Sequence, residues 1–257
     1  MSNVQLALIT GASSGLGKAL SQALAAKNIP LILVARNKEA LQTLAQELPV
    51  STHLHVADLT LPSERQKLFS TIATRCPDLI INNAGFGLYG EALSHSTQEQ
   101  SAIIELNVQA LLEITLEAAR TLKAKQRSGT IMNISSAGAF FPYPTFAVYT
   151  ASKRFVYQCS LALDVELTPH RIRVLTCCPG QILTGFRKRA SGGTSKQPGF
   201  FTLSSERAAE LILQQIERGQ RSAIIDWKYH LAVRLGQLIP SSWLMKGLKR
   251  SLLKYKM

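Results

Sequence analysis

The sequence is poor in the residues that mark several protein classes. Its 257 residues include four cysteines, and no two of them form a C-x-x-C pair. A disulfide framework is therefore excluded, and the usual signature of a zinc or thioredoxin-type site is missing, so we expect no metal. Charged residues make up 18% and hydrophobic residues 46%, which excludes a disordered chain. Cysteines this few favour a reduced, cytoplasmic location.

Acidic residues are also scarce, and unevenly so along the chain. The formal net charge is +13, from 29 Lys and Arg against 16 Asp and Glu. Residues 1–186 carry 15 basic and 12 acidic side chains, whereas residues 187–257 carry 14 and 4. Such a basic tail suits a nucleic-acid protein or one that rests on an anionic membrane. No recognisable nucleic-acid-binding motif is present, so we expect no nucleic-acid partner.

Short apolar runs alternate with helical patterns over most of the chain. The runs predict strands at 6–9, 31–35, 53–56, 79–81, 130–134, 174–177 and 223–225. Helices are predicted to begin near Gly15, Lys38, Pro62, Thr97, Val108, Val148 and Ser204. Apolar runs between helices are buried on both faces, which is typical of a parallel sheet. The order predicts one doubly wound α/β domain with helices on both faces, at residues 1–226.

A glycine-rich turn links the first predicted strand to the first predicted helix. Its glycine spacing is G-x-x-x-G-x-G, beginning at Gly11. Glycines let the backbone turn tightly beside a pyrophosphate, and the helix N-terminus offers free N–H groups and a positive dipole. We therefore predict nucleotide binding by Gly11, Ser13, Ser14, Gly15, Leu16 and Gly17.

Further motifs follow in a fixed order. They are Asn82-Asn83-Ala84-Gly85, Asn107 in Leu-Asn-Val, Ser136 after a strand, Tyr149-x-x-x-Lys153, and Pro179-Gly180 with Thr184 behind it. Over about residues 4–226 the chain resembles the short-chain dehydrogenase/reductase family. The resemblance implies a Rossmann-type domain and a nicotinamide-dependent oxidoreductase. Ser136 precedes Tyr149 by 13 residues, the family's usual spacing, which selects it over Ser135.

The resemblance also implies roles for individual residues. The catalytic set is Asn107, Ser136, Tyr149 and Lys153, of which Ser136 and Tyr149 would touch the substrate. Tyr149 and Lys153 would also contact the cofactor; Lys153 would bind the nicotinamide ribose, and Asn107 would support a water linked to it. Asp58 would contact the adenine, with Leu59 packed beside it. The remaining implied cofactor residues are Asn83, Ala84, Gly85, Pro179, Ile182 and Thr184.

The acid–base chemistry of the tyrosine–lysine pair can also be argued from the residues themselves. Tyr149 and Lys153 are spaced i, i+4 and share one face of a helix. A tyrosine is a poor acid or base at neutral pH, but a neighbouring ammonium favours the phenolate and lowers its pKa. Tyr149 can then exchange a proton with a carbonyl or hydroxyl oxygen while hydride moves at carbon. Ser136 is a neutral donor for the same oxygen.

The end of the second predicted strand bears on the choice of nicotinamide. An acidic residue there would bind the ribose of NAD, but Ala35 fills the place and Arg36 follows. A guanidinium suits a 2′-phosphate, so NADP(H) is favoured over NAD(H).

Aromatic residues gather where the substrate is expected. Three segments should wall an apolar pocket, and in the family the third covers the substrate as a mobile lid. They hold Phe86, Leu88 and Tyr89; Phe140, Phe141, Pro142, Tyr143 and Phe146; and Phe186, Arg187, Lys188, Arg189, Phe200 and Phe201. We expect oxidoreduction between a carbonyl and an alcohol on a 3-oxoacyl thioester, a steroid-like ketone or another lipophilic carbonyl. The alternatives are a non-catalytic NADP-sensing module and a nucleic-acid-binding protein.

Residues 227–257 form a basic C-terminal extension. From Trp243 to Lys256, apolar and basic residues fall on opposite sides of a helical wheel. Such a helix can lie on the inner face of a membrane as a surface anchor, or pack on the domain or on a second subunit of a homodimer or homotetramer. It can also meet an acidic carrier protein or an acyl-CoA.

Overall fold

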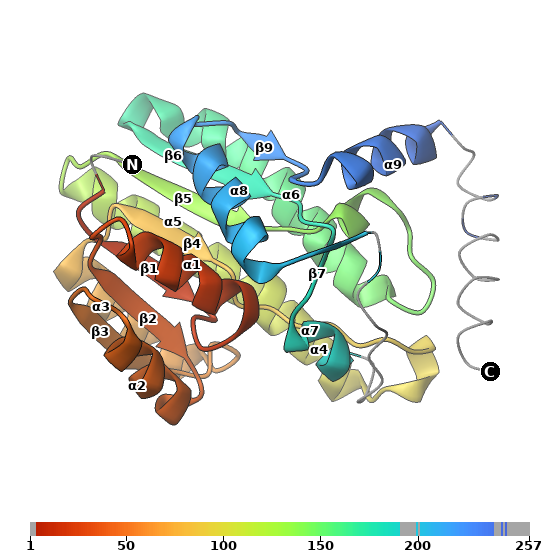
Figure 1. The fold of residues 1–257 in the computed structure, drawn as a ribbon, viewed down its shortest axis with the longest axis horizontal. Helices are drawn as coiled ribbons and strands as arrows, with labels where there is room; N and C mark the ends of the chain where they lie inside the picture. The colour runs from red at the N-terminus through yellow and green to blue at the C-terminus, as the bar shows by residue number, and fades with distance from the viewer. Residues whose placement is uncertain (1–3, 191–198, 200, 239–242, 244, 246–257) are drawn as a thin grey trace.

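A seven-stranded parallel sheet forms the centre of the computed structural model, which describes residues 4–190, 199, 201–238, 243 and 245. The strands lie in the order β3-β2-β1-β4-β5-β6-β9. Their bounds are β1 (Ala7–Thr10), β2 (Leu31–Ala35), β3 (Thr52–Val56), β4 (Leu79–Asn82), β5 (Gly129–Ile134), β6 (Ile172–Cys177) and β9 (Ser222–Ala223). The predicted doubly wound α/β fold is confirmed (Figure 1).

Two layers of helices cover the sheet because strand side chains alternate between its faces. Ile9 and Leu33 point into the layer of α1 (Gly15–Ala25), α2 (Lys38–Glu47) and α8 (Ser205–Glu217). Leu8 and Ile32 point into the layer of α3 (Pro62–Arg75), α5 (Leu111–Ala124) and α6 (Ala147–Leu167). All four of these strand side chains are fully buried, which explains why the strands read as continuous apolar runs.

The carboxyl ends of the strands share one edge of the sheet. The chain runs outward from β1 to β2 and β3, then returns to place β4 on the other side of β1. Ligands of open α/β sheets bind in the crevice at such a switch point. The loops after β1, β4 and β5, which carry the predicted motifs, all leave the sheet at this edge (Figure 1).

Apart from the short turn Thr168–His170, which precedes β6 at the opposite edge, the shorter elements build the rim of the carboxyl edge. They are η1 (Ala92–Ser94), α4 (Thr97–Ile104), the π-helical turn η2 (Glu105–Ala110), η3 (Ala137–Phe140), η4 (Thr168–His170), β7 (Gln181–Ile182), α7 (Gly185–Ala190), β8 (Thr202–Leu203) and α9 (Trp227–Gln237). The helix predicted to begin near Val108 begins instead at Leu111, because η2 precedes it. The last strand pairs one residue earlier than predicted. Among the described residues, no helix is both long and apolar enough to cross a bilayer.

Candidate active site

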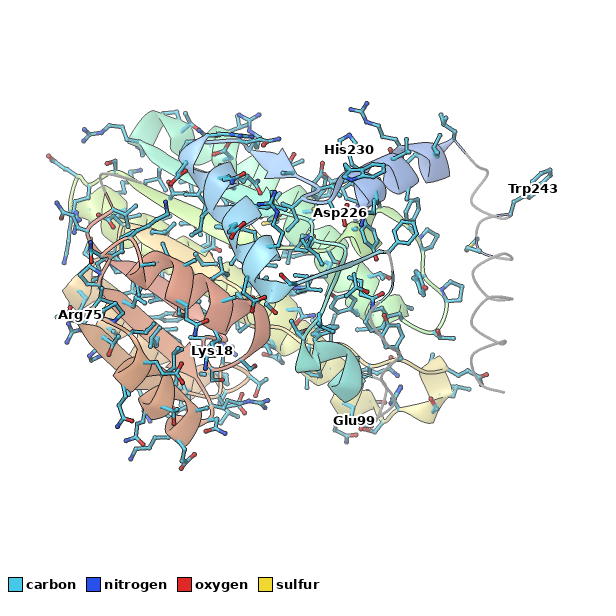
Figure 2. The ribbon with its side chains drawn as sticks, viewed as in Figure 1. Lys18, Arg75, Glu99, Asp226, His230 and Trp243 are labelled. Atoms are coloured by element: carbon cyan, nitrogen blue, oxygen red, sulfur yellow. The ribbon has the colours of Figure 1, made fainter. Side chains whose placement is uncertain are left out.

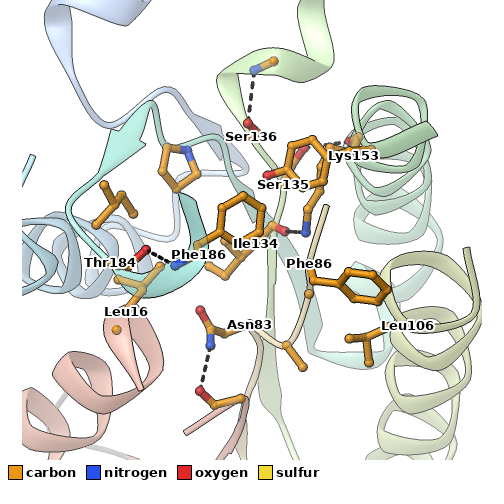
Figure 3. A pocket seen from close by; sticks show the side chains of 18 of the residues that line it. Leu16, Asn83, Phe86, Leu106, Ile134, Ser135, Ser136, Lys153, Thr184 and Phe186 are labelled. Carbon is orange, nitrogen blue, oxygen red and sulfur yellow. Dashed lines mark hydrogen bonds between the residues drawn. The ribbon is translucent and has the colours of Figure 1, made fainter. Parts of the chain in front are cut away.

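A cavity of about 880 Å³ opens at the carboxyl edge of the sheet. Residues from the loops after six strands line it, and one wall comes from α9. The predicted cofactor and catalytic residues line this single space, except for Gly17 and Asn107, which are described but lie behind it. Figure 3 shows how side chains from distant parts of the chain converge there.

The glycine-rich turn forms one floor of the cavity. Gly11 has φ +69°, a left-handed conformation that residues with a side chain rarely adopt. A Cβ on Gly17 would lie 2.0 Å from the carbonyl oxygen of Gly11, so α1 can approach the turn this closely only with glycine there. In the described structure no side chain caps α1 at Ser14, and its first turn holds no acidic residue. The helix start is therefore suited to a phosphate.

Asn83 fixes the loop after β4 against this turn. Its Nδ2 donates to the carbonyl oxygens of Thr10, at 3.0 Å, and Gly11, at 3.3 Å. The backbone N–H groups of Asn83 and Ala84 both donate to Thr10 Oγ1 at 3.0 Å. These bonds hold the two loops together across the switch point (Figure 3).

The two serines after β5 have different partners. Ser135 Oγ donates to the backbone oxygen of Lys153 at 2.7 Å, which ties β5 to α6. Ser136 Oγ accepts a hydrogen bond from the Gly138 N–H at 3.1 Å (Figure 3). Because that contact uses the oxygen as an acceptor, the Ser136 hydroxyl hydrogen can still be donated into the cavity.

Lys153 is a buried cation, with 4% of its surface exposed. Its Nζ donates to the Ile134 carbonyl oxygen at 2.9 Å and lies 5.9 Å from the centroid of the Tyr149 ring. Burial lowers the pKa of Lys153 to about 8, because removing water disfavours the ammonium form. At neutral pH the side chain is still mostly charged.

Tyr149 stands in a stack of aromatic rings. Its ring lies 4.2 Å from that of Phe146, which in turn lies 3.8 Å from that of Tyr89. Burial raises the pKa of Tyr149 above its ordinary value, and a hydrogen bond with Ser136 opposes that rise only partly. The prediction that Lys153 lowers this pKa is therefore wrong, because burial dominates. The phenol is protonated at neutral pH and is available as an acid.

Asn107 lies in η2 and is completely buried. Its Nδ2 donates to the Phe86 carbonyl oxygen at 2.9 Å and to Ser152 Oγ at 3.0 Å, and its Oδ1 accepts from the Phe86 N–H at 3.1 Å. A Cβ on Gly85 would lie 2.9 Å from Asn107 Oδ1 and 3.2 Å from Lys153 Nζ. The structure thus brings Asn107 next to the lysine, behind the cavity wall.

Arg36 lies at the far end of the cavity, after β2. Its side chain is 63% exposed, and Nη1 lies 3.6 Å from the Asp58 carboxylate. Asp58 also accepts from the N–H and the hydroxyl of Thr60 at 3.0 and 2.7 Å. Burial tends to raise the pKa of Asp58, but these hydrogen bonds and Arg36 lower it overall. The carboxylate thereby holds the guanidinium beside the end of β2.

Only some of the residues predicted to wall the substrate pocket line the cavity. The lining includes Phe86, Tyr89, Phe141, Tyr143, Phe146 and Phe186. Of the described residues predicted to join them, Leu88, Phe140, Pro142 and Phe201 lie outside the lining, and Phe140 packs edge-on against Tyr157 at 4.9 Å. Phe200, residues 191–198 and the side chains of residues 187–189 lie outside the described part.

One wall of the cavity is absent from the sequence-based prediction. Tyr229, Ala232 and Val233 of α9 line it. Gly180 admits the helix, because a Cβ there would lie 2.0 Å from the Tyr229 ring. The available signal was the spacing i, i+4, i+7 of Tyr229, Val233 and Gly236, which marks one helix face without saying what it touches.

Comparisons with known proteins agree with this geometry. The family model described as short chain dehydrogenase matches residues 5–194. An uncharacterized oxidoreductase of Staphylococcus epidermidis is 29% identical over 195 residues, 75% of this chain and 84% of the relative. The 17-beta-hydroxysteroid dehydrogenase type 3 of Mus musculus is 30% identical over 207 residues, 78% of this chain and 68% of the relative.

A solved structure extends the similarity to the whole fold. A short-chain dehydrogenase from Sphingobium yanoikuyae in complex with NADPH superimposes with a TM-score of 0.80 at 28% identity. The match covers 98% of this chain and 96% of that one.

Proposed function

The chain belongs to the short-chain dehydrogenase family, an oxidoreductase family that uses a nicotinamide cofactor, and on that premise we propose that it is an NADP(H)-dependent reductase of a lipophilic ketone or aldehyde. The observation that carries the proposal is the meeting of Tyr149, Ser136 and Lys153 in one cavity with an uncapped helix start.

The cavity has the features a dinucleotide requires. The backbone around Gly11 and Gly17 is too closely packed for side chains, and the start of α1 offers N–H groups to the pyrophosphate. Lys153, with a pKa of about 8, presents an ammonium suited to ribose hydroxyls. When bound, the nicotinamide supplies the hydride.

Tyr149 supplies the proton in this proposal. A carbonyl oxygen between Ser136 and Tyr149 receives a hydrogen bond from the Ser136 hydroxyl and the proton from the Tyr149 hydroxyl. The raised pKa of Tyr149 keeps the phenol protonated before reaction, so the proton for the carbonyl oxygen is in place. Lys153 then stabilises the phenolate that is left.

Arg36 supports a preference for the 2′-phosphorylated cofactor. Ala35 ends β2 without a carboxylate, and Arg36 lines the cavity beside it. A carboxylate at the end of β2 would accept bonds from both ribose hydroxyls, whereas a guanidinium pairs with a phosphate. Asp58 holds this guanidinium in place at 3.6 Å.

Replacing Arg36 with alanine should weaken NADPH binding by about 1.5–3 kcal/mol, the range for a hydrogen bond to a charged group, and leave NADH binding nearly unchanged. Calorimetric titration of both cofactors measures the difference. Lys38→Ala is the matched control, because it removes an exposed charge at the start of α2 outside the cavity lining. An equal loss for both cofactors, or a wild-type preference for NADH, would contradict the assignment.

The substrate space supports a lipophilic carbonyl. Its walls are mainly aromatic, and α9 adds Tyr229, Ala232 and Val233. Apolar walls with a few polar groups bind apolar ligands in a fixed orientation. The mouse relative is a hydroxysteroid dehydrogenase by name, which is in keeping with a bulky substrate.

Ala232→Trp tests this placement of the substrate. The indole would project into the cavity from α9 and lower kcat/KM for a bulky ketone by about tenfold or more, while a small ketone is affected less. Ala232→Ser is the control, since it changes polarity with little added volume. Rates are followed by the loss of NADPH absorbance, and the alcohol is identified by mass spectrometry.

Two results would count against the proposed function. If Ala232→Trp lowered kcat/KM equally for large and small ketones, or left both unchanged, the substrate would not lie against α9. If the wild type bound NADPH but reduced no ketone or aldehyde of any size, the chain would be a sensing module instead.

A further inference from the structure

The outward face of α9 carries an apolar stripe. Trp227, Leu231, Leu235 and Leu238 are exposed by 69, 49, 54 and 81%. Their spacing of four, four and three residues places them along one side of the helix. Surface helices normally present polar residues outward, so four large apolar side chains in line mark an interaction surface.

The opposite face of α9 is held on the protein. Val233 and Gly236 are buried, and the ring of Phe141 lies 2.7 Å from where a Cβ of Gly236 would be. Tyr229 packs on Gly180 at the cavity wall. The helix is therefore anchored by one face, and the stripe on its other face is exposed. In Figure 2 the buried Asp226 marks where α9 leaves the body, while His230 points outward.

The positive charge of this part of the chain indicates which kind of partner the stripe binds. From Trp227 to the end of the chain there are seven Lys and Arg and no Asp or Glu. Two of them, Lys228 and Arg234, flank the stripe on α9. A second copy of this chain would bring the same positive charge to a symmetric interface, which is unfavourable. An anionic lipid surface is complementary both to the charge and to the apolar stripe.

We propose that the outward face of α9 docks on an anionic membrane, with Trp227, Leu231, Leu235 and Leu238 entering the interface between headgroups and acyl chains. Tryptophan is enriched at that depth because its ring is apolar and its N–H is polar. Trp243 and Met245, both exposed, lie shortly after this helix in the chain.

Docking in this way would place the bilayer on the far side of the helix that walls the substrate cavity. Tyr229, Ala232 and Val233 form a cavity wall on the same helix that carries the stripe. A lipophilic ketone dissolved in the membrane would then be concentrated close to the cavity that holds Tyr149. This last step rests on the proposed function, whereas membrane binding itself does not.

Sedimentation with vesicles tests the docking. Full-length protein is mixed with phosphatidylcholine vesicles with and without phosphatidylserine, at low and high salt. We expect binding to the anionic vesicles alone, weakened by salt. Leu231→Ser with Leu235→Ser should lower the partition coefficient by at least about tenfold, since two exposed leucines lose their burial in the interface. The control is Val165→Ser, an equally exposed apolar residue (60%) near the end of α6.

The two tryptophans give a second readout that needs no destabilising variant. They are Trp227 and Trp243, so Trp243→Phe leaves Trp227 as the sole indole. Its emission should shift to the blue on anionic vesicles and be quenched by brominated lipid. An unshifted Trp227 in protein that sediments with vesicles would place the contact elsewhere and overturn the proposal.

Further outcomes overturn the proposal in distinguishable ways. Equal binding to neutral and anionic vesicles would show that the partner is not specifically an anionic membrane. A smaller particle in size-exclusion chromatography for the double serine variant, without vesicle binding by the wild type, would make the stripe a subunit interface. Thermal unfolding and NADPH titration of each variant check folding. Ketone reduction in vesicle-free buffer is measured separately, so failure of docking and failure of the proposed function are told apart.

Discussion

Replacing Tyr149 with phenylalanine is expected to lower kcat for NADPH-dependent ketone reduction by about a thousandfold, within the range that general acid catalysis contributes. The variant loses the transferable proton and keeps the ring, so the stack with Phe146 at 4.2 Å is preserved. NADPH affinity and melting temperature should therefore change little. Single-turnover absorbance measurements separate the loss of chemistry from any change in binding.

Tyr143→Phe is the matched control for that experiment. Tyr143 also lines the cavity and meets the Phe146 ring edge-on at 6.5 Å, so its replacement also removes one hydroxyl from the same space. Its turnover should stay close to that of the wild type. If Tyr149→Phe retained turnover within about tenfold of the wild type, another group would have to supply the proton.

Lys153→Met is expected to abolish turnover and yet make the protein more stable at pH 7. The pKa of Lys153 falls from its ordinary 10.5 to about 8 on folding, so burying the charged form costs about 3 kcal/mol below pH 8. Methionine has a similar length and carries no charge to desolvate. The variant should therefore gain up to that amount in free energy of unfolding.

The lowered pKa of Lys153 also makes the stability difference between the wild type and the variant depend on pH. Below pH 8 both folded and unfolded wild-type chains hold the proton on Lys153, and the difference from the variant is largest. Between pH 8 and 10.5 the unfolded chain binds more protons than the folded one, so wild-type stability rises and the difference narrows. Urea unfolding across this range measures it. Lys123→Met, an exposed lysine of α5, should show no such trend; a pH-independent difference for Lys153→Met would contradict the assigned pKa.

Local patterns in the sequence predicted the parts of the site that depend on neighbours in the chain. The glycine turn at Gly11, the strands and the Tyr149–Lys153 pair are such features, because backbone freedom and helical spacing are encoded within a few residues. Parallel order then placed the motifs at one edge of the sheet, as the structure confirms.

Features that depend on distant contacts were not predictable in this way. Tyr229 reaches the cavity only because Gly180, nearly fifty positions earlier, leaves room for its ring. The pKa of Tyr149 rises because the side chain is buried, with Phe146 and Phe186 packed against its ring, and burial outweighs the hydrogen bond with Ser136. The π-helical turn at Asn107 likewise accompanies hydrogen bonds to Phe86, in a loop twenty-one residues away.

The position of α9 in the chain bears on how proteins of this design diverge. The groups proposed for proton transfer and cofactor binding all precede Gly185, whereas the wall formed by Tyr229, Ala232 and Val233 comes from near the end of the sequence. Substitutions in this one helix therefore reshape the substrate space and leave the reacting atoms where they are. After gene duplication, selection can act on α9 to change which alcohol is made, while the residues for proton transfer and cofactor binding stay the same.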